Sequence, residues 1–293
     1  MIINGKKLAQ EKEKNLQRKL KRLIKIKKRK PQLISLVAQE DKLGLLYTQL
    51  KQEGAQRVGI KIKKVSFSLD QKEKIYPLLE KIIQKEKFDG LIIQKPSQQL
   101  IKKHFKNKKA FEIWWLTATS KIPEKKDVDC LNVANLGLLS AGLIQFYPAT
   151  VKAIYEILLT IYKEEELKGK NAVIIGSSEI LGKPLAMLLR NKGATVSLCG
   201  SSCQDLQSLV NKAEVVISCV GKPNLITAEM IKKGAVVIDA GITKIGSKIA
   251  GDVDFKKVAK IASFITPVPG GVGPLTVISL LENVVKAFKK GAD

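Results

Sequence analysis

Apolar positions along this chain recur at two different spacings, and the two spacings alternate. In the first half, short apolar runs predict strands at residues 31–39, 58–68 and 91–94. Apolar residues three or four positions apart predict amphipathic helices at residues 4–30, 43–56 and 71–87, the second ending near Gly54. Because each strand is followed by a helix before the next strand, we expect the strands to pair in parallel.

The second half repeats this alternation more regularly. Strands are predicted at residues 172–176, 194–200, 213–221, 235–241 and 262–268, with helices between them. This is the doubly wound pattern, in which ligands bind beyond the carboxyl ends of the strands. An amphipathic helix at residues 148–164 is expected to link the halves, and a last helix, Pro274 to Lys290, to pack back on the first half.

The fold class that follows is α/β, with two domains and a cleft between them. The first is an N-terminal α/β half, and the second is a doubly wound, Rossmann-type half. We expect the first domain to cover residues 1–146, completed by a C-terminal helix at 274–293, and the second to cover residues 147–273.

Residues 102–126 do not follow the alternation. The apolar stretch 110–120 predicts a short strand or a lid, and its adjacent Trp114 and Trp115 are typical of core or interface packing. His104, which is the only histidine of the chain, stands among lysines, and we expect it on the solvated surface.

Charge changes this picture less than its size suggests. The chain carries a net charge of +25, but only five of its 52 cationic residues are Arg and aromatic residues make up only 5%. Nucleic-acid sites rely on Arg and on stacking aromatics, so a lysine-rich solvated surface is the favoured interpretation. No apolar run approaches the roughly 18 residues of a membrane span, and the first residues lack the apolar core of a signal peptide. The four cysteines lack metal-site or disulfide spacing, so we expect no metal and a reducing, cytoplasmic location.

Small residues follow the predicted strands of the second half. The turn from Gly176 to Gly182, ahead of a helix with Pro184 near its start, is either a phosphate-binding turn or an ordinary connection. Candidate nucleotide-binding residues at these strand ends are Gly176, Ser177, Ser178, Ile180, Ser201, Ser202, Gly221 and Ile242. No acidic residue ends the strand at 194–200, which favours a nucleotide with a 2′-phosphate, and Ser201 and Ser202 could bind that phosphate.

In the first half, Tyr47 and Lys51 are four residues apart and therefore share one face of a helix. A lysine in a closed pocket loses proton affinity and can act as an acid or base near neutral pH. The alternative is an ordinary surface lysine beside a core tyrosine. Gln94 at a strand end and Asp129 in the sequence KDVD carry no signal on their own.

The run ITPVPGGVGPLTVISLLEN, residues 265–283, resembles the C-terminal signature of the methylenetetrahydrofolate dehydrogenase/cyclohydrolase family. The segments GSSEILGKPLAMLL, VGKP, GAVVIDAGI and GDVDF match the same family in the same order. The family's Tyr-x3-Lys falls on Tyr47 and Lys51, its strand-end Gln on Gln94, and its Lys-Asp-Val-Asp on residues 126–129.

The resemblance implies oxidation of 5,10-methylenetetrahydrofolate with NADP, NAD being the alternative, and hydrolysis of the product to 10-formyltetrahydrofolate. It implies that Lys51 transfers protons with support from Gln94, that Tyr47 packs on the folate, and that Asp129 holds the pterin. Pro267, Gly270 and Gly271 of the signature would contact the substrate. A cytoplasmic homodimer that serves one-carbon metabolism and purine biosynthesis, with no nucleic-acid or membrane partner, is the accompanying expectation.

The chain also departs from the family pattern. Cys130 stands where a glycine is usual, and Ser177 stands where an arginine is common. Two alternatives therefore remain at this point: a folate dehydrogenase without the hydrolytic step, and a lysine-rich nucleic-acid-binding protein on an inherited fold.

Overall fold

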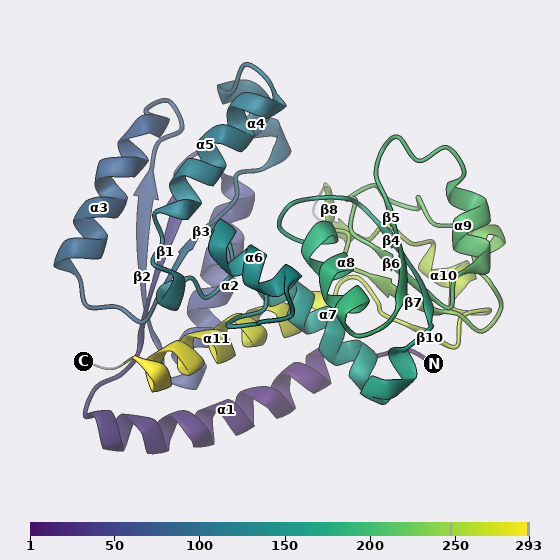
Figure 1. The fold of residues 1–293 in the computed structure, drawn as a ribbon, viewed down its shortest axis with the longest axis horizontal. Helices are drawn as coiled ribbons and strands as arrows, with labels where there is room; N and C mark the ends of the chain where they lie inside the picture. Colours follow the sequence, from purple (N-terminus) through teal and green to yellow (C-terminus); the bar gives the residue numbers. More distant parts are fainter. Residues whose placement is uncertain (247, 292–293) are drawn as a thin grey trace. The chain divides into compact units, whose positions relative to one another are not determined.

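The computed structural model describes residues 1–246 and 248–291. The chain divides into two compact units (Figure 1). We call residues 12–149 with 277–291 the three-stranded unit, and residues 1–11 with 150–276 the five-stranded unit. The last two positions of the expected helix 274–293 lie outside the described residues.

The α-helices are α1 (Gly5–Lys27), α2 (Lys42–Val58), α3 (Ile75–Lys85), α4 (Gln98–His104), α5 (Lys108–Ser120), α6 (Val133–Ser140), α7 (Ala149–Leu159), α8 (Gly182–Asn191), α9 (Leu206–Lys212), α10 (Phe255–Val258) and α11 (Val272–Lys290). The strands are β1 (Gln32–Ala38), β2 (Lys61–Phe67), β3 (Gly90–Ile93), β4 (Asn171–Ile175), β5 (Thr195–Cys199), β6 (Val215–Ser218), β7 (Val236–Asp239), β8 (Thr243–Ile245), β9 (Lys248–Ala250) and β10 (Phe264–Ile265). Short 3₁₀ turns are η1 (Lys72–Lys74), η2 (Glu124–Lys126), η3 (Glu164–Leu167) and η4 (Ala228–Met230).

The three-stranded unit is built on a parallel sheet of order β2-β1-β3. The central strand β1 is apolar because both of its faces are covered: Leu33, Ile34, Leu36 and Val37 are fully buried. Helix α2 continues beyond its expected end, so Gly54 is a buried residue within the helix. The helix stops at Gly59, which adopts the left-handed conformation. The parts of α1 and α11 that belong to this unit, residues 12–27 and 277–290, lie side by side and are joined by an ion pair of 2.9 Å between Lys12 Nζ and Glu282 Oε1 (Figure 1).

Two expectations for residues 102–126 are wrong. Residues 110–120 belong to helix α5, not to a strand or lid, although the expected packing of the two tryptophans is found. Trp114 and Trp115 are buried among Phe67, Phe105 and Phe111, and the neighbouring rings are 5.2 to 6.4 Å apart. This aromatic cluster gives the segment its own core contacts.

His104 is not on the surface either. Its side chain is only 6% exposed, and its Nδ1 lies 3.2 Å from Asp70 Oδ1. The lysines around it point to solvent, but His104 ends α4 on the side that faces the loop after β2. The neighbouring lysines led to the wrong prediction for His104, because one face of this short basic helix is buried.

The five-stranded unit has a fully parallel sheet of order β10-β7-β6-β4-β5, as expected for a doubly wound fold. The chain moves from β4 to β5 and then returns past β4 to β6. Right-handed crossovers consequently place α8 and α9 on opposite faces of the sheet, which Figure 1 shows. The reversal at β4 and β6 creates the switch point at which such folds bind ligands.

Two features of this unit were not expected from the sequence. The strands β8 and β9 form a small antiparallel hairpin. The first eleven residues group with this unit because Ile2 pairs with Ile265 at the sheet edge and Ile3 N donates to Ile265 O at 2.9 Å. No helix of the described part of the chain combines the length and apolarity that crossing a membrane requires.

Candidate functional site

Lys51 and Gln94 meet in the three-stranded unit. Helix α2 follows β1 and carries Lys51, while Gln94 directly follows β3, the neighbouring parallel strand. Gln94 N donates to Leu36 O of β1 at 2.7 Å, which anchors the backbone of Gln94. Lys51 Nζ donates to Gln94 Oε1 at 2.7 Å. The sheet therefore brings together two candidates that are 43 residues apart in the sequence.

Asp129 is the charged neighbour of Lys51. Burial lowers the pKa of Lys51, and the nearby Asp129 carboxylate opposes that shift by raising it. Burial likewise raises the pKa of Asp129, while Lys51 and the backbone N–H of Ala149, 2.9 Å from Asp129 Oδ1, lower it. The desolvated amine thus gives up its proton more easily than an exposed lysine, as an acid–base group requires.

The loop that presents Asp129 is held by Asp127, which the sequence reasoning did not single out. Asp127 is fully buried, and it accepts from the backbone N–H groups of Leu131 and Asn132, both at 2.9 Å, and from Asn135 Nδ2 at 2.8 Å. Burial raises the pKa of Asp127 to about 6 despite these bonds. In the sequence Asp127 is the first carboxylate of KDVD, directly after the charged residues 124–126, so its local composition gives no sign of burial.

Helix α11 also supports this loop. Asn283 Nδ2 donates to Val128 O and to Tyr147 O, each at 2.8 Å. Cys130, next to Asp129, has φ of +55°, the left-handed conformation that favours glycine. Tyr47 lies one turn before Lys51 on α2, half-buried, and burial raises the pKa of its phenol, which stays protonated near neutral pH.

A second candidate site lies at the carboxyl edge of the five-stranded sheet. Between β4 and α8, the turn with Ser177, Ser178 and Ile180 is closed tightly: a Cβ on Gly182 would lie 1.8 Å from Gly176 O. Gly176 itself has φ of +112°, and a Cβ there would lie 2.8 Å from Cys219 O at the end of β6. The ends of β4 and β6 can therefore lie this close together only because residue 176 has no side chain.

The other nucleotide candidates gather at the same edge. Ser201 and Ser202 follow β5 and are exposed, and a Cβ on Gly200 would lie 2.9 Å from Ser177 Oγ, so the first two turns are adjacent. After β6, Gly221 has φ of +77° and its carbonyl accepts from Thr243 Oγ1 at 2.8 Å. A Cβ on Gly221 would lie 3.5 Å from the carbonyl oxygen of Ile242, so these two candidates are neighbours.

Two buried carboxylates order this edge, and the sequence reasoning missed both. Asp252 accepts from Ser218 Oγ at 2.7 Å and from the N–H groups of Val220 and Lys222, each at 2.8 Å. Asp239 accepts from the N–H groups of Gly241, Asp252 and Val253, and burial raises its pKa to about 6. The sequence feature that could have identified them is an acidic residue among apolar and small ones, in VVIDAG and GDVDF.

Pro267, Gly270 and Gly271 also belong to the five-stranded unit, in the loop between β10 and α11. Gly270 O accepts from Lys6 N at 3.1 Å, and a Cβ on Gly5 would lie 1.8 Å from Gly271 O. The predicted substrate residues are thus divided between the units, with Tyr47, Lys51, Gln94 and Asp129 in the three-stranded unit.

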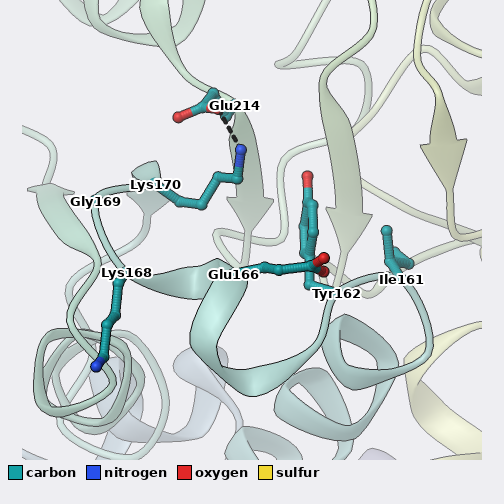
Figure 2. Close-up of a pocket in the computed structure, with 7 residues that line it drawn as sticks. All are labelled: Ile161, Tyr162, Glu166, Lys168, Gly169, Lys170 and Glu214. Atoms are coloured by element: carbon teal, nitrogen blue, oxygen red, sulfur yellow. Dashed lines mark hydrogen bonds and ion pairs between the residues drawn. The ribbon is translucent and has the colours of Figure 1, made fainter.

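An open pocket of about 700 Å³ lies elsewhere, beside the amino ends of β4 and β6 (Figure 2). It is lined by Ile161, Tyr162, Glu166, Lys168, Gly169, Lys170 and Glu214. Lys170 points toward Glu214, with 2.7 Å between Nζ and Oε1, while Lys168 points away (Figure 2). Since ligands of doubly wound folds bind at the carboxyl ends of the strands, this pocket is not part of the candidate site.

Comparisons with known proteins bear on both units. Residues 3–129 match the tetrahydrofolate dehydrogenase/cyclohydrolase catalytic domain, and residues 148–292 match the NAD(P)-binding domain of the same family. The chain is 39% identical to the bifunctional protein FolD of Nitratiruptor sp., covering 99% of this chain and 98% of that protein.

Solved structures agree with this similarity. The bifunctional methylenetetrahydrofolate dehydrogenase/cyclohydrolase of Campylobacter jejuni superposes with a TM-score of 0.86 at 33% identity, covering 99% of this chain and 98% of that one. The corresponding enzyme of Trypanosoma brucei, solved with NADP cofactor and an inhibitor, gives a TM-score of 0.89 at 32% identity, covering 99% and 97%.

Proposed function

This chain belongs to the tetrahydrofolate dehydrogenase/cyclohydrolase family, and on that premise we propose which of its residues carry out the two reactions. The family resemblance predicted from the sequence is confirmed, and the chain is a methylenetetrahydrofolate dehydrogenase and methenyltetrahydrofolate cyclohydrolase. Neither alternative, a dehydrogenase without hydrolysis or a nucleic-acid-binding protein, gains support from these relatives.

The first reaction removes a hydride from the methylene bridge between two folate nitrogens. The cation that forms is stabilised by those nitrogens, so the step depends on alignment of the substrate with the nicotinamide more than on a base. We assign folate binding to Tyr47 and Asp129, together with Pro267, Gly270 and Gly271. The Asp129 carboxylate has about four lone-pair positions, so its bond to Ala149 N leaves capacity for the pterin's N–H groups.

The second reaction adds water to the cation and opens the ring, and it requires proton transfer. The observation that carries the assignment is the contact of Lys51 Nζ with Gln94 Oε1 beside Asp129. Burial lowers the pKa of Lys51, so the amine releases its proton more readily than an exposed lysine does. Gln94 fixes the position of the amine through a hydrogen bond that does not depend on its charge state.

The nucleotide is NADP, held at the carboxyl edge of the five-stranded sheet. Three observations support this. No acidic residue ends β5; Ser201 and Ser202 are exposed there; and Asp205, the nearest carboxylate downstream, caps α9 by accepting from Ser208 N at 3.2 Å. Gly176, Ser177, Ser178, Ile180, Gly221 and Ile242 would line the rest of the site.

The finer expectations on assembly and location belong to the same proposal. We assign the catalytic, folate-binding domain to residues 1–146 with the C-terminal helix at 274–293, and the nucleotide-binding domain to residues 147–273. The enzyme would act as a cytoplasmic homodimer that supplies one-carbon units, including those for purine biosynthesis. Light scattering of the purified protein would show a mass of twice 32.3 kDa, and a single-chain mass would contradict the dimer.

Substitution of Lys51 by Met tests the assignment. General acid–base groups typically contribute about 10²-fold to 10⁴-fold, so the variant should lose cyclohydrolase activity by such a factor. Hydride transfer needs no such group, so methenyltetrahydrofolate should still form. Lys42→Met, which removes an exposed lysine at the start of the same helix, is the matched control and should leave both rates unchanged.

Both reactions are followed by absorbance in one preparation of each variant. If Lys51→Met lowers both rates by one common factor, Lys51 binds substrate or supports the fold, and the assignment fails.

A further inference from the structure

Asp41 and Gly44, at the start of α2, contact the segment that carries Gln94. Asp41 is only 3% exposed, and its Oδ2 accepts from the backbone N–H of Ser97 at 3.0 Å. Its own carbonyl accepts from Leu45 N at 2.8 Å, which begins the helix. One buried carboxylate therefore ties the first turn of α2 to the loop that follows β3.

Gly44 lies in the angle between Asp41 and Gln94. A Cβ built on Gly44 would lie 2.8 Å from Asp41 Oδ2 and 3.2 Å from Gln94 Cγ. Glycine inside a helix destabilises it by about 0.5–1 kcal/mol relative to alanine, so Gly44 is not there to stabilise α2. The missing Cβ instead provides the room in which Gln94 lies against the helix.

Gln94 links the start of α2 to Lys51. Gln94 is anchored to β1 by its backbone, and its Cγ rests beside Gly44 while its Oε1 receives the bond from Lys51. Gln94 is the side chain that touches both the start of α2 and the amine, so the effect of Asp41 and Gly44 on Lys51 passes through Gln94.

We propose that Asp41 and Gly44 are positioning residues for the hydrolytic reaction, which hold Gln94 within hydrogen-bonding distance of Lys51. This inference rests on the roles proposed for Lys51 and Gln94. A displacement of a positioning group by a few tenths of an ångström lowers the rate because proton transfer demands close heavy-atom approach. Hydride transfer does not use the pair and should be spared.

Gly44→Ala is the first test. The added methyl group must push Gln94 or Asp41 aside, and cyclohydrolase kcat should fall about tenfold or more, while the dehydrogenase rate stays within about twofold. Gly137→Ala is the matched control, because Gly137 is also inside a helix of the same unit and its Cβ would meet no atom within 4 Å. The melting temperature of Gly44→Ala shows how far the helical preference of alanine offsets this crowding, and the rates are compared at a temperature at which both proteins are folded.

A double-mutant cycle separates positioning from a general structural effect. In a Gln94→Ala background the side chain through which the crowding reaches Lys51 is absent, so adding Gly44→Ala should change the cyclohydrolase rate by less than about twofold, although the contact with Asp41 remains. A Gly44→Ala effect that persists undiminished in that background overturns the inference, as does an equal loss of both activities in Gly44→Ala alone.

Asp41 gives an independent measurement if Gly44→Ala does not fold. Asp41→Ala removes the acceptor for Ser97 N and should selectively slow hydrolysis, whereas Asp41→Asn keeps an acceptor oxygen and should retain most of the rate. If Gln94→Ala and Lys51→Met are selective but the Asp41 and Gly44 variants are not, only this inference fails. If Gln94→Ala itself has no selective effect, the proposed function of the pair fails first.

Discussion

At the scale of single residues, burial of the pair Lys51 and Asp129 has opposite effects on its two members. It lowers the pKa of the amine and raises the pKa of the carboxylate, because each charged form loses solvation. Their mutual attraction opposes both shifts. The proton affinity of Lys51 therefore depends on whether residue 129 carries a charge.

Asp129→Asn should shift the pH dependence of hydrolysis. The Asp129 carboxylate raises the pKa of Lys51, so its removal lets that pKa fall further. The limb of the cyclohydrolase profile that reports Lys51 should move to lower pH, and NADP affinity should not change. The profile is measured after subtraction of uncatalysed hydrolysis, with Lys51→Met as the control that lacks the limb. A limb that stays in place would show that Asp129 does not influence Lys51.

Cys130 allows a separate prediction about stability. A non-glycine residue in the left-handed conformation is disfavoured by about 1–2 kcal/mol, and Cys130 has φ of +55°. Cys130→Ala and Cys130→Gly both remove the thiol, but only glycine relieves the backbone. After allowance for the greater entropy of unfolded glycine, Cys130→Gly should be the more stable by about 0.5–1 kcal/mol. Urea unfolding at pH 7 measures the difference, and equal or reversed stabilities would contradict it.

At the scale of elements, the turn between β4 and α8 depends on glycine at both of its ends. Gly176 provides a positive φ at the strand end, and Gly182 lets the helix begin against the carbonyl of Gly176. Pro184, the third residue of α8, lies in the first turn, where the missing N–H has no helical partner to lose. The first turn of α8 is thus set directly beside the end of β4, as a phosphate site requires.

Gly182→Ala should therefore weaken nucleotide binding. Its Cβ would lie 1.8 Å from backbone, which cannot move aside as a side chain does, so the turn must open. We expect NADP affinity to fall at least about tenfold, equivalent to about 1.4 kcal/mol. Gly273→Ala, whose Cβ would meet nothing within 4 Å, is the control. Calorimetric titration with NADP that gave the parental affinity for Gly182→Ala would exclude this role of the turn.

At the scale of the whole molecule, the lysine excess has at least one structural use. Edge strand β2 exposes Lys61, Lys63 and Lys64 along its length. Charged side chains on an edge strand discourage pairing with other chains, so these lysines protect the sheet. The remaining excess gives the molecule a positive field that attracts anionic ligands, and both NADP and folates are anions.

This field should appear in the kinetics of binding. With a net charge of +25, the association rate constants of NADP and of the folate substrate should fall as salt increases, while the dissociation rate constants change less. Stopped-flow fluorescence between about 0.05 and 0.5 M ionic strength measures both. An association rate that does not depend on salt would mean that the lysines have no steering effect.

Much of this protein follows from its sequence. The spacing of apolar residues determines the strands and helices of both halves, because a buried strand and an amphipathic helix each need their own period. The run 265–283 and the turn at Gly176 are local patterns, which is why they identified the family. The Tyr-x3-Lys pair is also local, and the family resemblance gave it a role. The fold class was predictable for the same reason: parallel pairing follows from alternation alone.

Burial and long-range contact were decided only by the tertiary structure. His104 looked exposed among lysines, yet one face of its short helix is covered. Asp127, Asp239 and Asp252 are ordinary acidic residues in the sequence, and only packing turned them into the acceptors that order the loops. Lys51 became distinct from the other lysines through Gln94 and Asp129, which lie 43 and 78 residues away in the chain. A pKa and a hydrogen bond depend on neighbours in space, and these neighbours exist only once the sheet has formed.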